Sequence, residues 1–138
     1  MLQKLGLVFI LICLMPFFSN CGGKYDEVIS LNGEFVEVME DYVENLDKAD
    51  SAKTVAAAMN DFSDKMDDLA PRLKEMAQKY PELKDPKNLP DELRASQKKS
   101  EELGKRMAGS MMKMMQYMMS PEVQAAQQRM SQVMGSMN

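Results

Sequence analysis

The side chains with the clearest chemical potential in this sequence are thioethers. Sixteen of its 138 residues are methionine, and the densest run, MMKMMQYMM, occupies residues 111–119. Methionine sulfur is a soft ligand that favours Cu(I) over Zn²⁺ or Mg²⁺, and spacings of three or four residues place side chains on one face of a helix. A Cu(I) or Ag(I) site is therefore one hypothesis for this run. Its candidate ligands are Met111, Met112, Met114, Met115 and Met118.

The same methionines are suited to helix packing or to binding a partner, and packing is the more ordinary role. Four of them continue the apolar stripe of one predicted helix and are expected to face a core; they are Met107, Met111, Met114 and Met118. Met112, Met115 and Met119 fall outside that stripe. Either the next helix covers these three, or they form an exposed, adaptable surface for a helical partner protein, a second copy of the chain or lipid.

Catalysis has little support in the composition. The chain has no histidine, which is the commonest general base and metal ligand, so a di-iron site of the Glu-x-x-His type is excluded. The adjacent carboxylates at residues 67–68 and 101–102 point to different sides of their helices, and there is no Gly-rich phosphate loop or nucleophile elbow. We expect no enzymatic activity and no cofactor. A net charge of −4 also disfavours a nucleic-acid partner.

The first residues predict export. Residues 5–18 are apolar and uncharged, and as a helix they would span about 21 Å, short of the roughly 30 Å core of a bilayer. This length is typical of a signal peptide rather than a membrane-spanning helix. Cys13 lies within this segment.

Residues 18–23 read FSNCGG, and this sequence resembles the lipobox of bacterial lipoprotein precursors. The resemblance implies that residues 1–20 are removed and that Cys21 becomes the first residue and carries covalent lipid. Residues 21–24 would then tether the protein to a membrane. Because Gly22 is not the retention-type Asp, the resemblance implies the cell envelope, at the outer membrane and facing the periplasm.

Residues 25–138 predict one helical domain. Apolar residues recur at alternating spacings of three and four in four segments. These segments cover about residues 25–48, 52–80, 91–119 and 121–138, and Asp50 or Ser51 can cap the second. Pro71 should kink the second helix without ending it, and residues 81–90, with three prolines, should form a loop. The predicted fold is all-α: an up-down antiparallel helical bundle or a long helical hairpin, with a shorter fourth C-terminal helix.

Charge differs along the chain. Residues 24–50 hold nine acidic residues and two lysines, for a net −7, whereas residues 90–138 hold seven basic and five acidic residues, for a net +2. We expect the acidic first helix to lie beside the basic third, or else to offer an acidic surface to a cationic partner. Taken together, the sequence predicts a membrane-anchored envelope lipoprotein with a non-catalytic structural or protein-interaction role.

Overall fold

The computed structural model describes residues 23–136, apart from the side chain of Lys113, and this part of the chain forms four α-helices without strands. The helices are α1 (Asp26–Lys48), α2 (Ala52–Lys79), α3 (Asp91–Met114) and α4 (Pro121–Gly135). Three short 3₁₀ segments join them: η1 (Pro81–Lys84), η2 (Pro86–Asn88) and η3 (Met115–Tyr117). The predicted all-α fold with a shorter fourth helix is confirmed. The predicted signal peptide and Cys21 lie outside the described residues.

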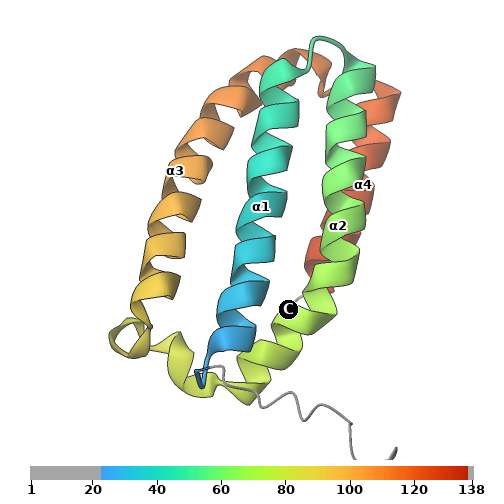
Figure 1. Cartoon of the computed structure of the whole chain (residues 1–138). Coiled ribbons are helices and arrows are strands. Elements are labelled where there is room, and N and C mark those ends of the chain that lie inside the picture. Colours follow the sequence, from blue (N-terminus) through green and yellow to red (C-terminus); the bar gives the residue numbers. More distant parts are fainter. Residues whose placement is uncertain (1–22, 137–138) are drawn as a thin grey trace, which may run out of the picture.

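The helices form an up-down bundle that is open on one side. α1 packs against α2 and α3, whereas α4 packs against α2. Figure 1 shows α3, α1 and α2 side by side, with α4 behind α2. Within residues 23–136, α3 and α4 have no extensive contact with each other. None of the helices within residues 23–136 is long and apolar enough to cross a bilayer.

The start of α2 is fixed by a capping box. The Thr54 backbone N–H donates to Ser51 Oγ at 3.3 Å, and the Ser51 N–H donates to Thr54 Oγ1 at 3.1 Å. These two bonds satisfy N–H groups that the first turn of a helix leaves without partners. Pro71 lies inside α2 without ending it, and the ribbon changes direction in the C-terminal half of the helix (Figure 1). The predicted cap at Ser51 and the continuity of the helix through Pro71 are confirmed.

The main core follows the regular apolar stripe of α2. Six residues of that stripe are buried: Val55, Met59, Phe62, Met66, Leu69 and Met76. α1 adds Leu31, Tyr42 and Leu46 to this core, and α4 adds Val123, Ala126 and Val133. The rings of Tyr42 and Phe62 stack with their centroids 4.5 Å apart. Thus α1, α2 and α4 share one core, which α3 joins at its last residue, Met114.

The predicted end of the third helix, at residue 119, was wrong. α3 ends at Met114, and η3 then turns the chain towards α4. The Tyr117 hydroxyl donates to the Asp50 carbonyl at 2.7 Å, which ties this turn to the connection between α1 and α2. Pro121 also disfavours helical geometry at Ser120. Ser120 is the N-cap residue of α4, but its side chain makes no capping bond, because its hydroxyl donates to the Tyr117 carbonyl at 2.7 Å.

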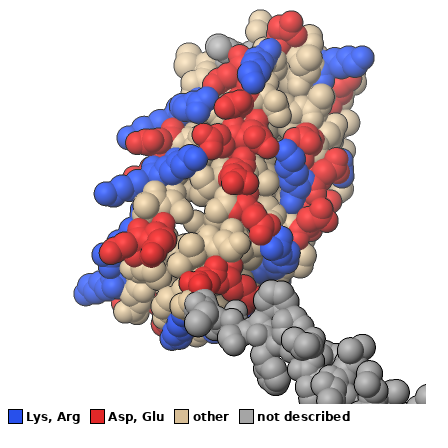
Figure 2. Space-filling model, viewed as in Figure 1, with Lys and Arg blue, Asp and Glu red and all other residues tan. Residues whose placement is uncertain are grey.

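Ion pairs cover the outer side of α1 (Figure 2). Three pairs join α1 to α2: Glu27–Lys79, Glu34–Arg72 and Asp41–Lys65. Two pairs join it to α3: Glu40–Lys99 and Asp47–Arg106. The acidic first helix therefore lies beside the basic third, as predicted, and it is partly neutralised by α2 as well. Exposed pairs of this kind are screened by solvent, and each contributes little to stability.

Candidate functional site

A groove of about 1010 Å³ lies between α3 and α4. Its floor is made by Phe35, Met39 and Tyr42 of α1 and by Met59 and Phe62 of α2. One wall is the end of α3 with η3, and the other is the side of α4. The groove exists because α4 packs behind α2 rather than against α3, so the space behind α1 stays open to solvent.

The lining of this groove is dominated by methionine. Ten of the lining residues are methionines: Met39, Met59, Met107, Met111, Met112, Met114, Met115, Met118, Met130 and Met134. The others are the three aromatic residues of the floor and four uncharged polar residues of α4, namely Gln124, Gln127, Gln128 and Ser131. None of the lining side chains that the structure describes carries a charge.

The periodicity of α1 explains why the groove and the charged surface lie on different sides of the molecule. Residues of a helix that are two positions apart point about 200° apart. Glu37 and Glu44 are exposed, whereas Phe35 and Tyr42, two positions before each of them, face inward. Figure 2 shows the charged side, which is the side of α1 turned away from α4.

The three methionines predicted to leave the core stripe are strongly exposed. Met112 is 76% exposed, Met115 71% and Met119 83%. Met112 and Met115 line the groove, but Met119 does not belong to its lining. The structure therefore separates one member of the predicted set from the other two. Whether any of the three binds a partner stays a prediction.

The expectation that Met111 faces a core was wrong, because its side chain is 54% exposed. No described helix covers that side of α3, since α4 packs on α2. The other members of the stripe fit the expectation better: Met114 is buried, and Met107 and Met118 are partly buried against the core.

All five methionines proposed as soft-metal ligands line the groove. The thioether of Met118 already accepts a hydrogen bond from Gln127 Nε2 at 3.3 Å. Within residues 23–136, no cluster of three Asp, Glu, His or Cys side chains could hold a metal ion. The soft-metal hypothesis therefore depends on thioethers.

Sequence reasoning missed four methionines that join the groove from other segments: Met39, Met59, Met130 and Met134. Met39, Met59 and Met130 follow the apolar stripes of their own helices, so each looked like an ordinary core residue. No signal in the sequence shows that their helices converge on one groove, because that depends on where α4 packs.

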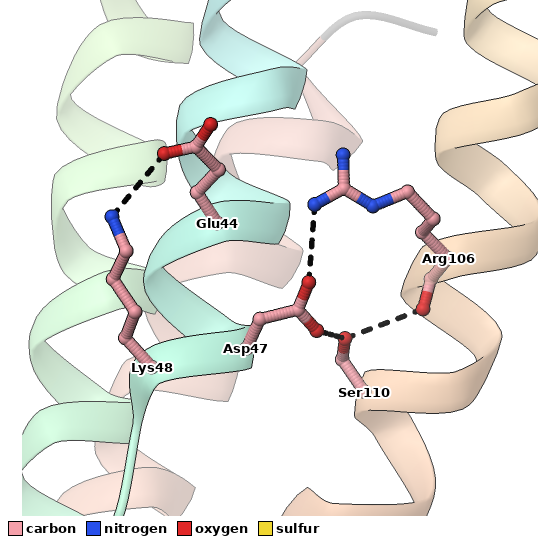
Figure 3. A network of polar contacts seen from close by, with 5 residues as sticks. All are labelled: Glu44, Asp47, Lys48, Arg106 and Ser110. Atoms are coloured by element: carbon pink, nitrogen blue, oxygen red, sulfur yellow. Dashed lines mark hydrogen bonds and ion pairs between the residues drawn. The ribbon is translucent and has the colours of Figure 1, made fainter.

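A polar network fixes the α3 wall to α1 (Figure 3). Asp47 of α1 accepts hydrogen bonds from the Ser110 hydroxyl and, at 3.1 Å, from Arg106 Nη2. The Ser110 side chain is buried, and its single hydroxyl proton is shared between Asp47 and the Arg106 carbonyl, which lies 3.2 Å from Oγ. A small apolar cluster of Val36, Val43 and Leu103 lies in the same interface. These contacts set the position of α3 next to its exposed methionines.

The floor of the groove stays uncharged over the physiological pH range. Burial disfavours the phenolate and raises the pKa of Tyr42 to about 12. The arrangement as a whole has the chemistry of an apolar binding surface. It offers thioethers, aromatic rings and neutral amides rather than acids, bases or nucleophiles.

Comparisons with known proteins give no relatives for this chain: no protein-family model matches it, and neither a curated protein nor a solved structure is significantly similar to it.

Proposed function

We propose that this chain is a membrane-anchored, non-catalytic binding protein of the bacterial cell envelope, and that the methionine groove is its binding surface. The observation that carries the proposal is the segregation of side chains: charged residues cover one side of α1, and an uncharged groove with ten methionines opens on the other. Contiguous exposed apolar surface is typical of interaction sites. Methionine suits such surfaces because its flexible side chain adapts to partners of different shape.

The anchoring part of the proposal is supported by the lipobox-like residues 18–23 and agrees with the geometry. The described chain begins beside the C-terminal end of α2, where Tyr25 donates to Glu82 at 3.1 Å. η3, which lies within the methionine run of residues 111–119, is at the other end of α1, which has 23 residues and is about 35 Å long. A lipid on Cys21 would hold the groove away from its own bilayer, facing the aqueous space.

Lipidation is tested by metabolic labelling with palmitate in bacteria that produce the wild type or the Cys21→Ala variant. We expect label on the wild type and none on the variant. Equal labelling of the two proteins, or labelling of neither, would contradict the anchoring proposal.

The binding surface is tested by photo-crosslinking in intact cells. Benzoylphenylalanine replaces one residue at a time: Met112 or Met115 in the groove, Met119 outside it, or Glu44 on the charged side. We expect adducts at positions 112 and 115 that are absent or much weaker at positions 119 and 44. Equal adducts at all four positions, or none in the groove, would contradict the proposal.

A second candidate function is the binding of Cu(I) or Ag(I), favoured by the convergence of ten thioethers on one groove. The test is anaerobic titration with Cu(I) against the chelator bicinchoninate. A variant with Met112→Leu and Met115→Leu keeps the apolar volume but loses two sulfurs. If the protein competes with the chelator for Cu(I) and this variant competes more weakly, the metal function gains support. If the wild-type protein does not compete for Cu(I), the metal function is wrong.

A further inference from the structure

We infer that the occupant of the methionine groove is an amphipathic helix of a partner protein, seated behind α1 and between α3 and α4. This inference rests on the proposal that the groove is the binding surface and adds the kind of ligand. Three properties of the groove carry it: its shape, its size and the chemistry of its lining.

The shape is that of a missing helix. α1 has α2 and α3 as neighbours, and α4 stands behind α2 (Figure 1). In a closed bundle another helix would lie behind α1 and beside α4, at the usual distance of about 8–10 Å between axes. Within the described residues no helix lies there. The side chains that such a helix would contact are the ones that line the groove, including Met39 of α1, Met111 of α3 and Met130 of α4.

The size fits a short helix. An α-helix with its side chains has a diameter of about 10–12 Å and a pitch of 5.4 Å, so each turn occupies roughly 420–610 Å³. The groove of about 1010 Å³ therefore accommodates about two turns. The lining of α4 gives a similar length of nearly three turns, since Gln124 and Met134 are ten residues apart and span about 15 Å of helix.

The chemistry of the lining favours a helix over a lipid. A fatty acid or a phospholipid has an anionic head, which proteins usually bind with Lys or Arg. The described lining offers no such cation. It offers an apolar floor for the apolar face of a helix and, along α4, the side chains of Gln124, Gln127, Gln128 and Ser131. Amides and hydroxyls both donate and accept hydrogen bonds, so they can meet polar residues of either charge at the margin of a bound helix.

A second copy of the chain fits less well. Two copies that meet groove to groove would bring two concave surfaces together and leave a void between them, whereas stable interfaces are packed about as densely as protein interiors. A convex helix fills a concave groove with its own side chains. Because thioethers adapt, we expect the groove to recognise the amphipathic pattern of a helix more than one particular sequence.

The experiment uses the full chain. The probe is a fluorescently labelled 18-residue peptide of Leu, Lys and Glu with equal numbers of Lys and Glu, whose leucines form one helical stripe. A control peptide has the same composition in an order that destroys the stripe. Binding is measured by fluorescence anisotropy, and circular dichroism checks that each protein variant is folded.

We expect saturable binding of the amphipathic peptide and binding of the control peptide that is weaker by roughly tenfold or more. The double variant Met112→Gln and Met115→Gln should also bind the amphipathic peptide roughly tenfold more weakly. Met119→Gln should bind like the wild type, because Met119 is equally exposed but lies outside the groove lining. Met112→Leu with Met115→Leu should retain binding, since the helix needs apolar contact rather than sulfur.

Three results would overturn the inference. One is equal affinity for the two peptides, and another is an equal loss of binding in the Met119→Gln variant. The third is a dimer of the wild type in sedimentation velocity that the double Gln variant abolishes, because the occupant would then be a second copy. If any of these occurs while crosslinks still form at positions 112 and 115, the groove remains a binding surface and the helical occupant is wrong. If crosslinks are absent as well, the proposed function fails with it.

Discussion

α2 and α3 are similar in length, with 28 and 24 residues, but they are held in the bundle in different ways. α2 packs between α1 and α4 and buries ten residues, including Met66, whose exposed fraction is 0%. α3 packs on α1, and its buried side chains are fewer: Leu93, Leu103, Ser110 and Met114. Part of its attachment is polar, through Lys99–Glu40 and the Asp47 network.

This difference in packing assigns α2 mainly to the stability of the fold and α3 mainly to the binding groove. The groove has one wall, α4, that shares the main core with α2. Its other wall, α3, joins that core at Met114 and is otherwise held by a smaller cluster and by polar contacts. Elements with few buried apolar contacts open at a lower free energy than the core. We therefore expect α2 to set the global stability of the protein and α3 to adjust the width of the groove.

The largest effect should come from the centre of α2. Met66→Ala removes a fully buried side chain that other atoms cannot readily replace, so we expect the free energy of unfolding to fall by about 2–5 kcal/mol. Guanidinium denaturation followed by circular dichroism measures this change. Met119→Ala is the matched control on the surface and should change stability by less than about 0.5 kcal/mol. If both variants lost similar free energy of unfolding, Met66 would not be the core residue that this comparison requires.

A smaller and more local effect is expected in α3. Leu103→Ala removes the α3 residue of the small cluster with Val36 and Val43, at a cost of about 2–3 kcal/mol. Because α3 is attached through few such contacts, its amide protons should exchange faster with solvent while those of α2 change little. Hydrogen exchange monitored by mass spectrometry tests this expectation. Equal acceleration in both helices would mean that α3 belongs to the same cooperative unit as α2.

The polar network that attaches α3 to α1 should contribute less to the free energy of unfolding than Leu103 does. Asp47→Ala leaves the Arg106 guanidinium without this carboxylate and leaves the buried Ser110 hydroxyl with the Arg106 carbonyl as its acceptor, at a cost of about 1 kcal/mol. Glu44→Ala is the control from the same helix, because Glu44 makes one exposed pair with Lys48 at 3.3 Å (Figure 3). Its loss should cost about 0.3–0.5 kcal/mol or less. Equal losses in denaturation experiments would show that the network adds nothing to the attachment of α3.

Tyr42, in the floor of the groove, should make the free energy of unfolding depend on pH only under alkaline conditions. The pKa of Tyr42 is raised by burial from 10.0 to about 12. As the pH rises through this window, the unfolded chain loses the phenol proton while the folded chain keeps it, so the free energy of unfolding falls. Below pH 10 this contribution does not change. Tyr42→Phe should remove it, and a variant that loses stability above pH 10 just as the wild type does would place the effect elsewhere.

The sequence predicted α2 well because its apolar stripe is regular and its cap is a local signal. It predicted the end of α3 poorly. Methionine is a good helix former, so the run at residues 111–119 holds no local stop. The helix ends earlier because Tyr117 bonds to Asp50, which is 67 residues away in the sequence. Such a contact has no local signature.

The candidate site was predictable only as far as local sequence patterns define it. A run of methionines that is too wide for one stripe indicates either coverage by another helix or exposure, and the structure shows exposure of Met112, Met115 and Met119. The groove itself depends on the packing of α4 behind α2. With α4 in this position, Met39 and Met130 line the groove and Met119 does not. Helix periodicity gives the face of each helix, but it does not give the neighbour that the face meets.

The central claim is that the groove methionines meet a ligand and that Met119 does not. Oxidation by hydrogen peroxide tests it directly, because each exposed thioether takes up one oxygen to give a sulfoxide and water, and mass spectrometry locates the product. Without ligand, Met112, Met115 and Met119 should all react quickly. With the amphipathic peptide at saturation, we predict that Met112 and Met115 are protected and that Met119 still reacts at its original rate. Equal protection of all three, or protection of none, would contradict the account.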